Sequence, residues 1–131
     1  MVELGDEKVL YAFDKTLEPA LVVPSGTTVR VRTKDCFGNQ VQRPDDELDE
    51  INWDHINPAT GPIFVEGAVP GGALKVTIEA IEFDGQTASC TGEGEGVCGD
   101  RFNAWSTHLC EIDGDELVWD ETLRIPVRPL I

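Results

Sequence analysis

The sequence has little positive charge. Its 131 residues carry 10 Lys and Arg against 25 Asp and Glu, a net charge of -15. A surface of this sign repels phosphate and anionic lipid, which argues against nucleic acid or a membrane as partner. No apolar run approaches the roughly 18 residues of a membrane-spanning helix, and the first residues lack the basic and apolar regions of a signal peptide. We therefore expect an acidic protein of the cytoplasm.

Residues that build the common catalytic and metal sites are also scarce. The two histidines, His55 and His108, are far apart in the chain. Cys90 and Cys98 lie eight residues apart, not two to four as in a zinc knuckle, so free thiols are expected. A Ser-His-Asp or Cys-His triad cannot be built convincingly from these residues. The glycine-rich run 91–96 lacks the Lys-Ser/Thr of a phosphate loop and alternates with carboxylates, so it predicts a flexible or close-packed loop.

Long helical patterns are lacking, and short β patterns between turns fill the chain. A short helix or a solvated acidic loop is expected over residues 43–56, where the charge is mostly negative. Together these patterns predict an all-β fold, an antiparallel β-sandwich or jelly-roll-like domain with little helix, formed by residues 1–131 as a single domain. The expected strands are residues 8–13, 20–23, 28–32, 63–65, 74–81, 86–89, 105–112, 116–119 and 123–127.

Turn residues predict how some of these strands are joined. Pro24-Ser25-Gly26 is a proline-led turn, so the strands that flank it, 20–23 and 28–32, are expected to form a hairpin. Asp113-Gly114 is a strong hairpin signal for the strands on either side. Pro126 cannot donate a backbone hydrogen bond, which predicts an edge position for the last strand.

Polar side chains gather at two strand ends. Asp35, Asn39 and Gln40 follow one predicted strand together with an aromatic residue, the composition of a binding loop on a rigid scaffold. The alternative is a turn that Asp and Asn side chains stabilise. Glu66 directly follows the apolar run 63–65 and precedes a glycine turn, so it faces something other than a core. Its alternative role is to accept backbone donors of that turn.

Three stretches carry a resemblance to a known family. NPATGPIFVEGAVPGGALKVTI, residues 57–78, resembles the signature of the acetamidase/formamidase family, in which a TGPI-aromatic-Val-Glu block precedes a proline-glycine turn and a strand. LVVPSGTTVRVRTKDCFGNQVQ, residues 21–42, resembles the amino-terminal hairpin of that family with its Asp-Cys-Phe loop. LRIPVRPLI, residues 123–131, resembles the run that closes its first domain. The chain is thus similar to the amino-terminal domain alone, and it stops before the histidine-rich and Gly-Asp-Leu-His segments with which family members continue.

The resemblance implies hydrolysis of short linear amides to a carboxylate and ammonia, and leaves open a bound divalent metal, zinc or calcium. Glu66 matches the glutamate of the TGPI block and Asp35 matches the acidic residue before Cys-Phe. Glu66 is then the candidate catalytic base or metal ligand. Asp35, Asn39, Gln40 and Asn57 are the candidates for binding the substrate amide or stabilising the oxyanion.

Because the resemblance places further parts of the active site beyond residue 131, we expect a complementary carboxy-terminal domain or subunit as partner, within a homo-oligomer. Apolar surface where that partner docks is expected near Leu130-Ile131. The alternative is a non-catalytic β-sandwich that binds a ligand or a protein, or that serves oligomer assembly.

Overall fold

The structure, a computed structural model, describes residues 1–83 and 85–127. In these residues the regular elements are short strands, and the helical elements are two single-turn 3-10 helices, η1 (Trp53–His55) and η2 (Gly99–Arg101). The prediction of an all-β chain with little helix is confirmed. None of the described helices has the length and apolar character needed to cross a membrane.

The chain divides into two compact units. The first unit consists of Met1–Asn39 and Asn52–Glu79, and the second of Gln40–Ile51 and Ala80–Ile131. The single domain over residues 1–131 stays a prediction. Leu130-Ile131, where we expected an apolar docking surface, lie outside the described residues.

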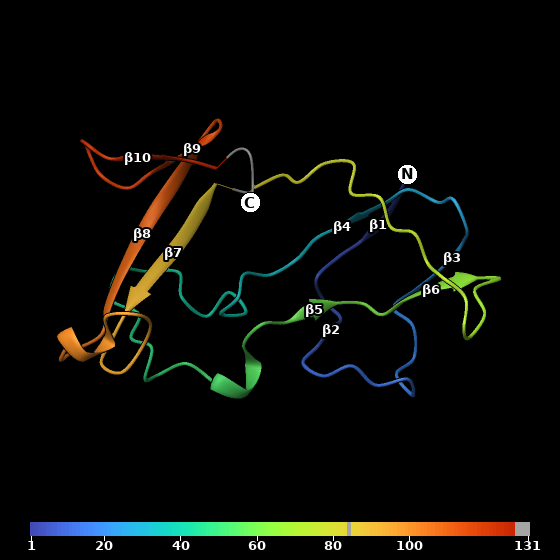
Figure 1. The fold of residues 1–131 in the computed structure, drawn as a ribbon, viewed down its shortest axis with the longest axis horizontal. Coiled ribbons are helices and arrows are strands. Elements are labelled where there is room, and N and C mark those ends of the chain that lie inside the picture. The colour runs from blue at the N-terminus through green and yellow to red at the C-terminus, as the bar shows by residue number, and fades with distance from the viewer. Residues whose placement is uncertain (84, 128–131) are drawn as a thin grey trace. The chain divides into compact units, whose positions relative to one another are not determined.

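The strands of the first unit form two-stranded pairs (Figure 1). Two of these pairs are parallel, which the prediction of an antiparallel fold did not include. In the parallel pairs β1 (Val2–Leu4) lies beside β4 (Val29–Val31), and β3 (Leu21–Pro24) lies beside β6 (Ile63–Glu66). In the antiparallel pair β2 (Val9–Leu10) lies beside β5 (Ala59–Thr60).

The predicted hairpin around residues 24–26 was wrong in its pairing, although its turn is present. The Thr27 N–H and hydroxyl both donate to the Pro24 carbonyl oxygen, at 3.3 and 2.7 Å, and Gly26 supplies a φ of 84°. The two arms then separate, and each pairs with a more distant strand, β3 with β6 and β4 with β1. The turn signal is local, whereas the choice of partner depends on residues far along the chain.

The predicted strand over residues 74–81 was also wrong, because no strand is formed there. The alternation of apolar and polar residues is present, but no described strand pairs with these residues through the backbone hydrogen bonds that define a strand. Of the short helix considered for residues 43–56, only the single turn η1 is formed within this range. There the Asn52 side chain accepts a hydrogen bond from the Asp54 N–H at 3.0 Å.

The second unit contains a four-stranded antiparallel sheet in the order β10-β9-β8-β7. The register pairs Asp113 with Glu116, so Gly114 and Asp115 form a two-residue turn, and the hairpin prediction is confirmed. Pro126 lies in the edge strand, also as predicted. The strands are β7 (Gln86–Thr91), β8 (Ser106–Asp113), β9 (Glu116–Val118) and β10 (Arg124–Pro126).

The glycine-rich run 91–96 is part of a close-packed loop. Gly92 is buried, and a Cβ atom there would lie 2.0 Å from Cε3 of Trp105. At Gly99 a Cβ atom would lie 2.6 Å from the backbone carbon of Gly94, whose N–H donates to the Gly99 carbonyl at 3.1 Å. Close packing is therefore observed at Gly92, whereas residues 93–97 are exposed and a Cβ atom at Gly94 or Gly96 would meet nothing within 4 Å.

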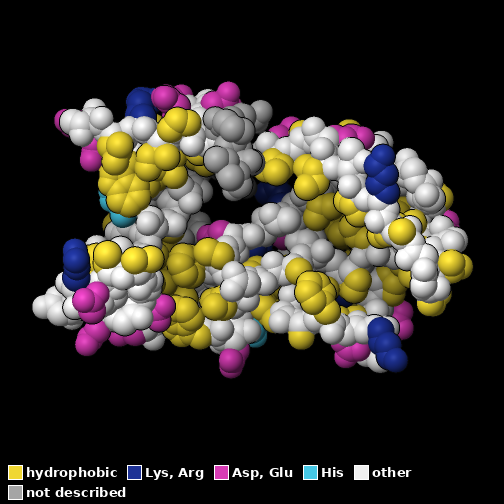
Figure 2. All heavy atoms as spheres, viewed as in Figure 1, with side chains coloured by type: hydrophobic (Ala, Val, Ile, Leu, Met, Phe, Trp, Pro, Cys, Tyr) yellow, Lys and Arg dark blue, Asp and Glu magenta, His cyan; other side chains and the backbone are white. Residues whose placement is uncertain are grey.

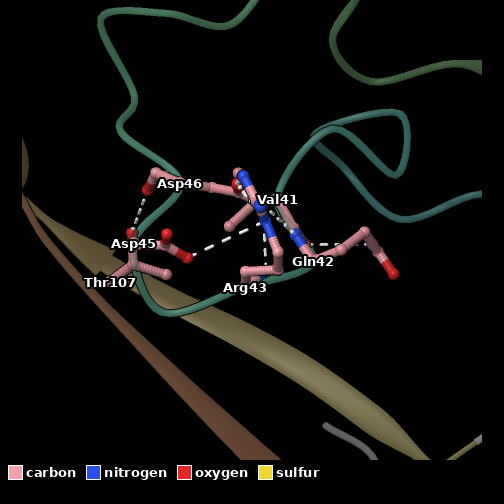
Figure 3. Close-up of polar contacts among 6 residues, drawn as sticks. All are labelled: Val41, Gln42, Arg43, Asp45, Asp46 and Thr107. Atoms are coloured by element: carbon pink, nitrogen blue, oxygen red, sulfur yellow. Dashed lines mark hydrogen bonds and ion pairs between the residues drawn. The ribbon is translucent and has the colours of Figure 1, made fainter.

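Residues 40–51 pack against the sheet of the second unit. Val41 and Leu48 are buried at 2 % and 3 % exposure, and Cys110 of β8 is buried too. The Thr107 hydroxyl donates to the Asp46 carbonyl oxygen at 3.0 Å, which ties this segment to β8 (Figure 3). Buried side chains and this hydrogen bond thus hold an acidic segment that has no regular structure of its own.

The Asp46 carboxylate organises the start of this segment (Figure 3). It accepts the backbone N–H groups of Gln42 and Arg43 at 2.8 and 2.9 Å, and the Arg43 guanidinium at 2.8 Å. The hydrogen bond from the Gln42 N–H, followed by the bonds from Arg43, lowers the pKa of Asp46 from its ordinary value of 3.8. The ionised carboxylate is therefore the form that stabilises the turn.

Replacing Val41 by Ala should destabilise the chain by about 2 kcal/mol, because it removes buried methyl groups and leaves a cavity. Urea unfolding monitored by circular dichroism measures the change. Val97→Ala in the same unit is the matched control, since Val97 is fully exposed and its truncation should leave the midpoint unchanged. Equal midpoints for both variants would contradict the packing described for residues 40–51.

Asp46→Asn should lower stability at neutral pH, and the difference from the wild type should shrink in acid. A carboxyl whose folded pKa lies below its unfolded value stabilises the fold fully above the unfolded value, and this contribution is lost as the pH falls through the folded pKa. The urea midpoints of the two proteins should therefore converge below pH 3.8. Asp45→Asn, at an exposed neighbouring residue, is the control. If the difference in urea midpoint between Asp46→Asn and the wild type does not change with pH, the shape of the Asp46 side chain and not its charge stabilises the turn.

Candidate functional site

Asp35 and Asn39 close a loop that follows β4 in the first unit. The Asn39 N–H donates to Oδ1 of Asp35 at 2.7 Å, and the Asp35 N–H donates to Oδ1 of Asn39 at 3.1 Å. The Gly38 N–H also donates to the Asp35 carbonyl oxygen, at 3.0 Å. The turn role that the sequence left open for these residues is therefore present. The second carboxylate oxygen of Asp35 and the Nδ2 group of Asn39 take no part in these bonds.

The backbone of this loop limits which residues it accepts. Asn39 has a φ of 62° and the preceding Gly38 has a φ of 67°. Asparagine tolerates the left-handed region better than most residues, because its short side chain forms local hydrogen bonds. Asn39 is thus selected by the turn itself, whatever else its amide group does.

Asn57 joins the same loop through its backbone. Its N–H donates to the Cys36 carbonyl oxygen at 2.6 Å, and its φ of 51° is again in the left-handed region. The structure therefore brings Asn57 together with Asp35 and Asn39, although the residues are separated in sequence. All three side chains are exposed.

Glu66 is the last residue of β6, where the parallel register pairs it with Pro24. Its side chain is exposed and, within residues 1–83 and 85–127, forms no hydrogen bond or ion pair. The turn that follows is closed by its own backbone, with the Ala68 N–H donating to the Val65 carbonyl at 3.2 Å and the Gly72 N–H to Val69 at 3.0 Å. The alternative role, in which Glu66 accepts donors from this turn, is thus not observed.

The structure does not gather all the candidate residues. No described bond joins Glu66 to the loop at residues 35–39. Gln40 belongs to the second unit, where it is half-buried. The candidates therefore form one cluster, Asp35 with Asn39 and Asn57, and a separate carboxylate, Glu66, in the same unit.

The two histidines have different surroundings. His108 of β8 is bonded through Nε2 to the Trp119 carbonyl oxygen at 2.7 Å, and its ring lies 4.3 Å from that of Trp119, so it links β8 to the end of β9. His55 is exposed and stacks on Tyr11 with 4.8 Å between ring centroids. No sequence signal pairs residues 11 and 55, because neither lies in a motif that involves the other.

A metal centre does not emerge from the described residues. In the part of the chain that the structure describes, no three His, Cys, Asp or Glu side chains lie close enough together to hold a metal ion. The four cysteines are free, as predicted. The described residues do not form a metal site by themselves, so the zinc or calcium that the resemblance left open stays a hypothesis, and we derive no chemical step through a metal.

Comparison with known proteins identifies the family. The family model for acetamidase/formamidase matches residues 5–114. No match was found among curated proteins. The model matches well over half of the chain and includes two of the three stretches that carried the resemblance, residues 21–42 and 57–78.

Solved structures agree with this assignment. An acetamidase from Bacillus halodurans is 33 % identical with a TM-score of 0.82, and a predicted acetamidase/formamidase from Thermoanaerobacter tengcongensis is 41 % identical with a TM-score of 0.89. An acetamidase from Yersinia enterocolitica shares the fold at 18 % identity and a TM-score of 0.69. Each match covers 95 % of this chain and 42 % of the other, as expected for an amino-terminal domain alone. The chain belongs to the acetamidase/formamidase family.

Proposed function

We propose that this chain is part of an amide hydrolase that converts short linear amides to a carboxylate and ammonia. The observation that carries the proposal is the family match over residues 5–114, together with 41 % identity to a predicted acetamidase/formamidase over 95 % of the chain. The chain spans less than half the length of the structures it matches. We therefore propose that activity also requires the part of the family fold that these 131 residues do not cover.

Amide hydrolysis requires a base for the attacking water, donors for the oxyanion and a proton for the leaving nitrogen. We assign the first role to Glu66. Its carboxylate takes a proton from water while the oxygen of that water bonds to the amide carbon. The C–N bond then breaks, and the departing nitrogen takes up a proton to leave as ammonia. The exposed carboxylate of Glu66, which has no partner within the described residues, is compatible with this role.

Amide groups at the other cluster suit substrate binding. The side chains of Asn57 and Asn39 each carry an NH2 group that can donate to a carbonyl oxygen or an oxyanion. Both side chains are exposed and lie in one loop cluster with Asp35. We propose that this cluster binds the substrate amide.

One observation is equally compatible with the alternative function, a module for binding or assembly. The Asp35 carboxylate already accepts the Asn39 N–H, so a structural role accounts for part of its chemistry without any substrate. Two variants of Asp35 and one of Glu66 separate the alternatives.

Glu66→Gln should lower ammonia release by at least about 100-fold, because a glutamine cannot accept the proton of water. The assay uses formamide and acetamide with this chain co-expressed with the carboxy-terminal part of the Thermoanaerobacter tengcongensis relative. Glu18→Gln, at an exposed glutamate of the same unit, is the matched control and should keep wild-type activity. Equal rates for the two variants would remove Glu66 from the mechanism, and no release in any combination would favour the binding module.

Asp35→Asn and Asp35→Ala should differ in stability. Asparagine keeps an oxygen that can accept the Asn39 N–H, whereas alanine loses this bond, at a cost of about 1 kcal/mol. If the negative charge of Asp35 binds substrate, Asp35→Asn should reduce kcat/KM in the same assay while its urea midpoint stays unchanged. Full activity in Asp35→Asn, with loss only in Asp35→Ala, would restrict Asp35 to the turn.

A further inference from the structure

Residues 74–79 have the pattern of a strand but lie exposed. Leu74, Val76 and Ile78 alternate with polar residues, which in a strand would place them on one face. Their exposed fractions are 62 %, 75 % and 73 %. Figure 2 shows that apolar side chains of this chain reach the surface among acidic ones. Three large apolar residues in strict alternation form an ordered stripe that differs from singly scattered exposed residues.

The backbone of this segment is also unpaired. Within residues 1–83 and 85–127, no backbone N–H or carbonyl group of residues 74–79 forms a hydrogen bond with another backbone group. A side-chain bond from the Thr28 hydroxyl to Oε1 of Glu79, at 3.4 Å, joins the end of the segment to the residue that precedes β4. The segment thus offers both a strand edge and an apolar face, the two features that an added strand uses.

We propose that residues 74–79 are a docking strand, which a strand from the remainder of the acetamidase/formamidase fold completes. The structures that match 95 % of this chain contain more than twice its length, so the family fold includes a large part that these residues do not cover. The identity of this partner strand rests on the proposed function. The strand can belong to the same polypeptide or to another one. Docking would pair the backbone of residues 74–79 and cover Leu74, Val76 and Ile78.

The net charge of the chain opposes a second copy as the occupant. Two copies would each bring a net charge of -15, and their mutual repulsion opposes association. Within residues 74–79 the charges of Lys75 and Glu79 balance, so the segment itself does not repel a neutral or basic strand. An apolar, locally neutral edge on an acidic protein is suited to a partner other than itself.

The test uses this 131-residue chain, co-expressed with an affinity-tagged carboxy-terminal part of the Thermoanaerobacter tengcongensis relative. The tagged part should retain the wild-type chain. Amide hydrogen exchange at residues 74–79 should be fast in the chain alone and at least about 100-fold slower in the complex, because paired amides exchange only on opening. Val76→Asp should reduce retention by about tenfold or more, since it places a charge on the buried face.

Val69→Asp is the matched control, because Val69 lies in the same unit with 69 % exposure but outside residues 74–79. It should be retained like the wild type, and circular dichroism should show that both variants fold. Equal retention of Val76→Asp, no retention of the wild type, or retention without protection at residues 74–79 would each overturn the proposal. So would a dimer of the chain alone that Val76→Asp dissociates, since a second copy would then be the occupant.

Ammonia release keeps this proposal separate from the proposed amidase function. Protected amides at residues 74–79 in a complex that releases no ammonia would support docking and count against the amidase function. Release of ammonia by a complex in which Val76→Asp changes neither retention nor rate would count against docking alone.

Discussion

The parallel pairing of β3 with β6 is the constraint on which the first unit depends. Parallel strands cannot be joined by a tight turn, so the chain must make a long excursion between Pro24 and Ile63 before it returns in register. That excursion contains the Asp35 loop and Asn57, and the return ends at Glu66. This pairing therefore determines where the candidate carboxylate emerges, and the loop cluster lies in the excursion between the two paired strands.

The sheet of the second unit depends on contacts of shorter range, and this explains why more of it could be predicted. β8 and β9 are joined by a two-residue turn, and the Asp113-Gly114 signal and the edge position of Pro126 can both be read from a few neighbouring residues. The parallel pairs of the first unit leave no such signal. Leu21 faces Ile63 because of residues far along the chain, so a local pattern predicts the strands but not their partners.

The same distinction applies to the candidate site. Two features of the site could be predicted from the sequence, because each follows from neighbouring residues. These are the position of Glu66 at a strand end and the turn formed by Asp35 and Asn39. The approach of Asn57 to Cys36 and the stacking of Tyr11 on His55 could not be predicted, because these residues meet only after the chain has folded. Residues 74–81 do alternate between apolar and polar side chains. A strand also requires a neighbouring strand to bond with, and the alternation does not indicate whether one is present.

The distribution of apolar side chains links folding to function in this family domain. Among the described residues four apolar side chains are buried and twenty large ones are exposed, a small core for a chain of this length. Any partner that binds the folded chain and covers such side chains also shifts the folding equilibrium toward the folded form. If the carboxylate of Glu66 acts only beside groups from that partner, the contact that completes the site also stabilises the strands that hold it. Catalysis and stability would then depend on the same docking step.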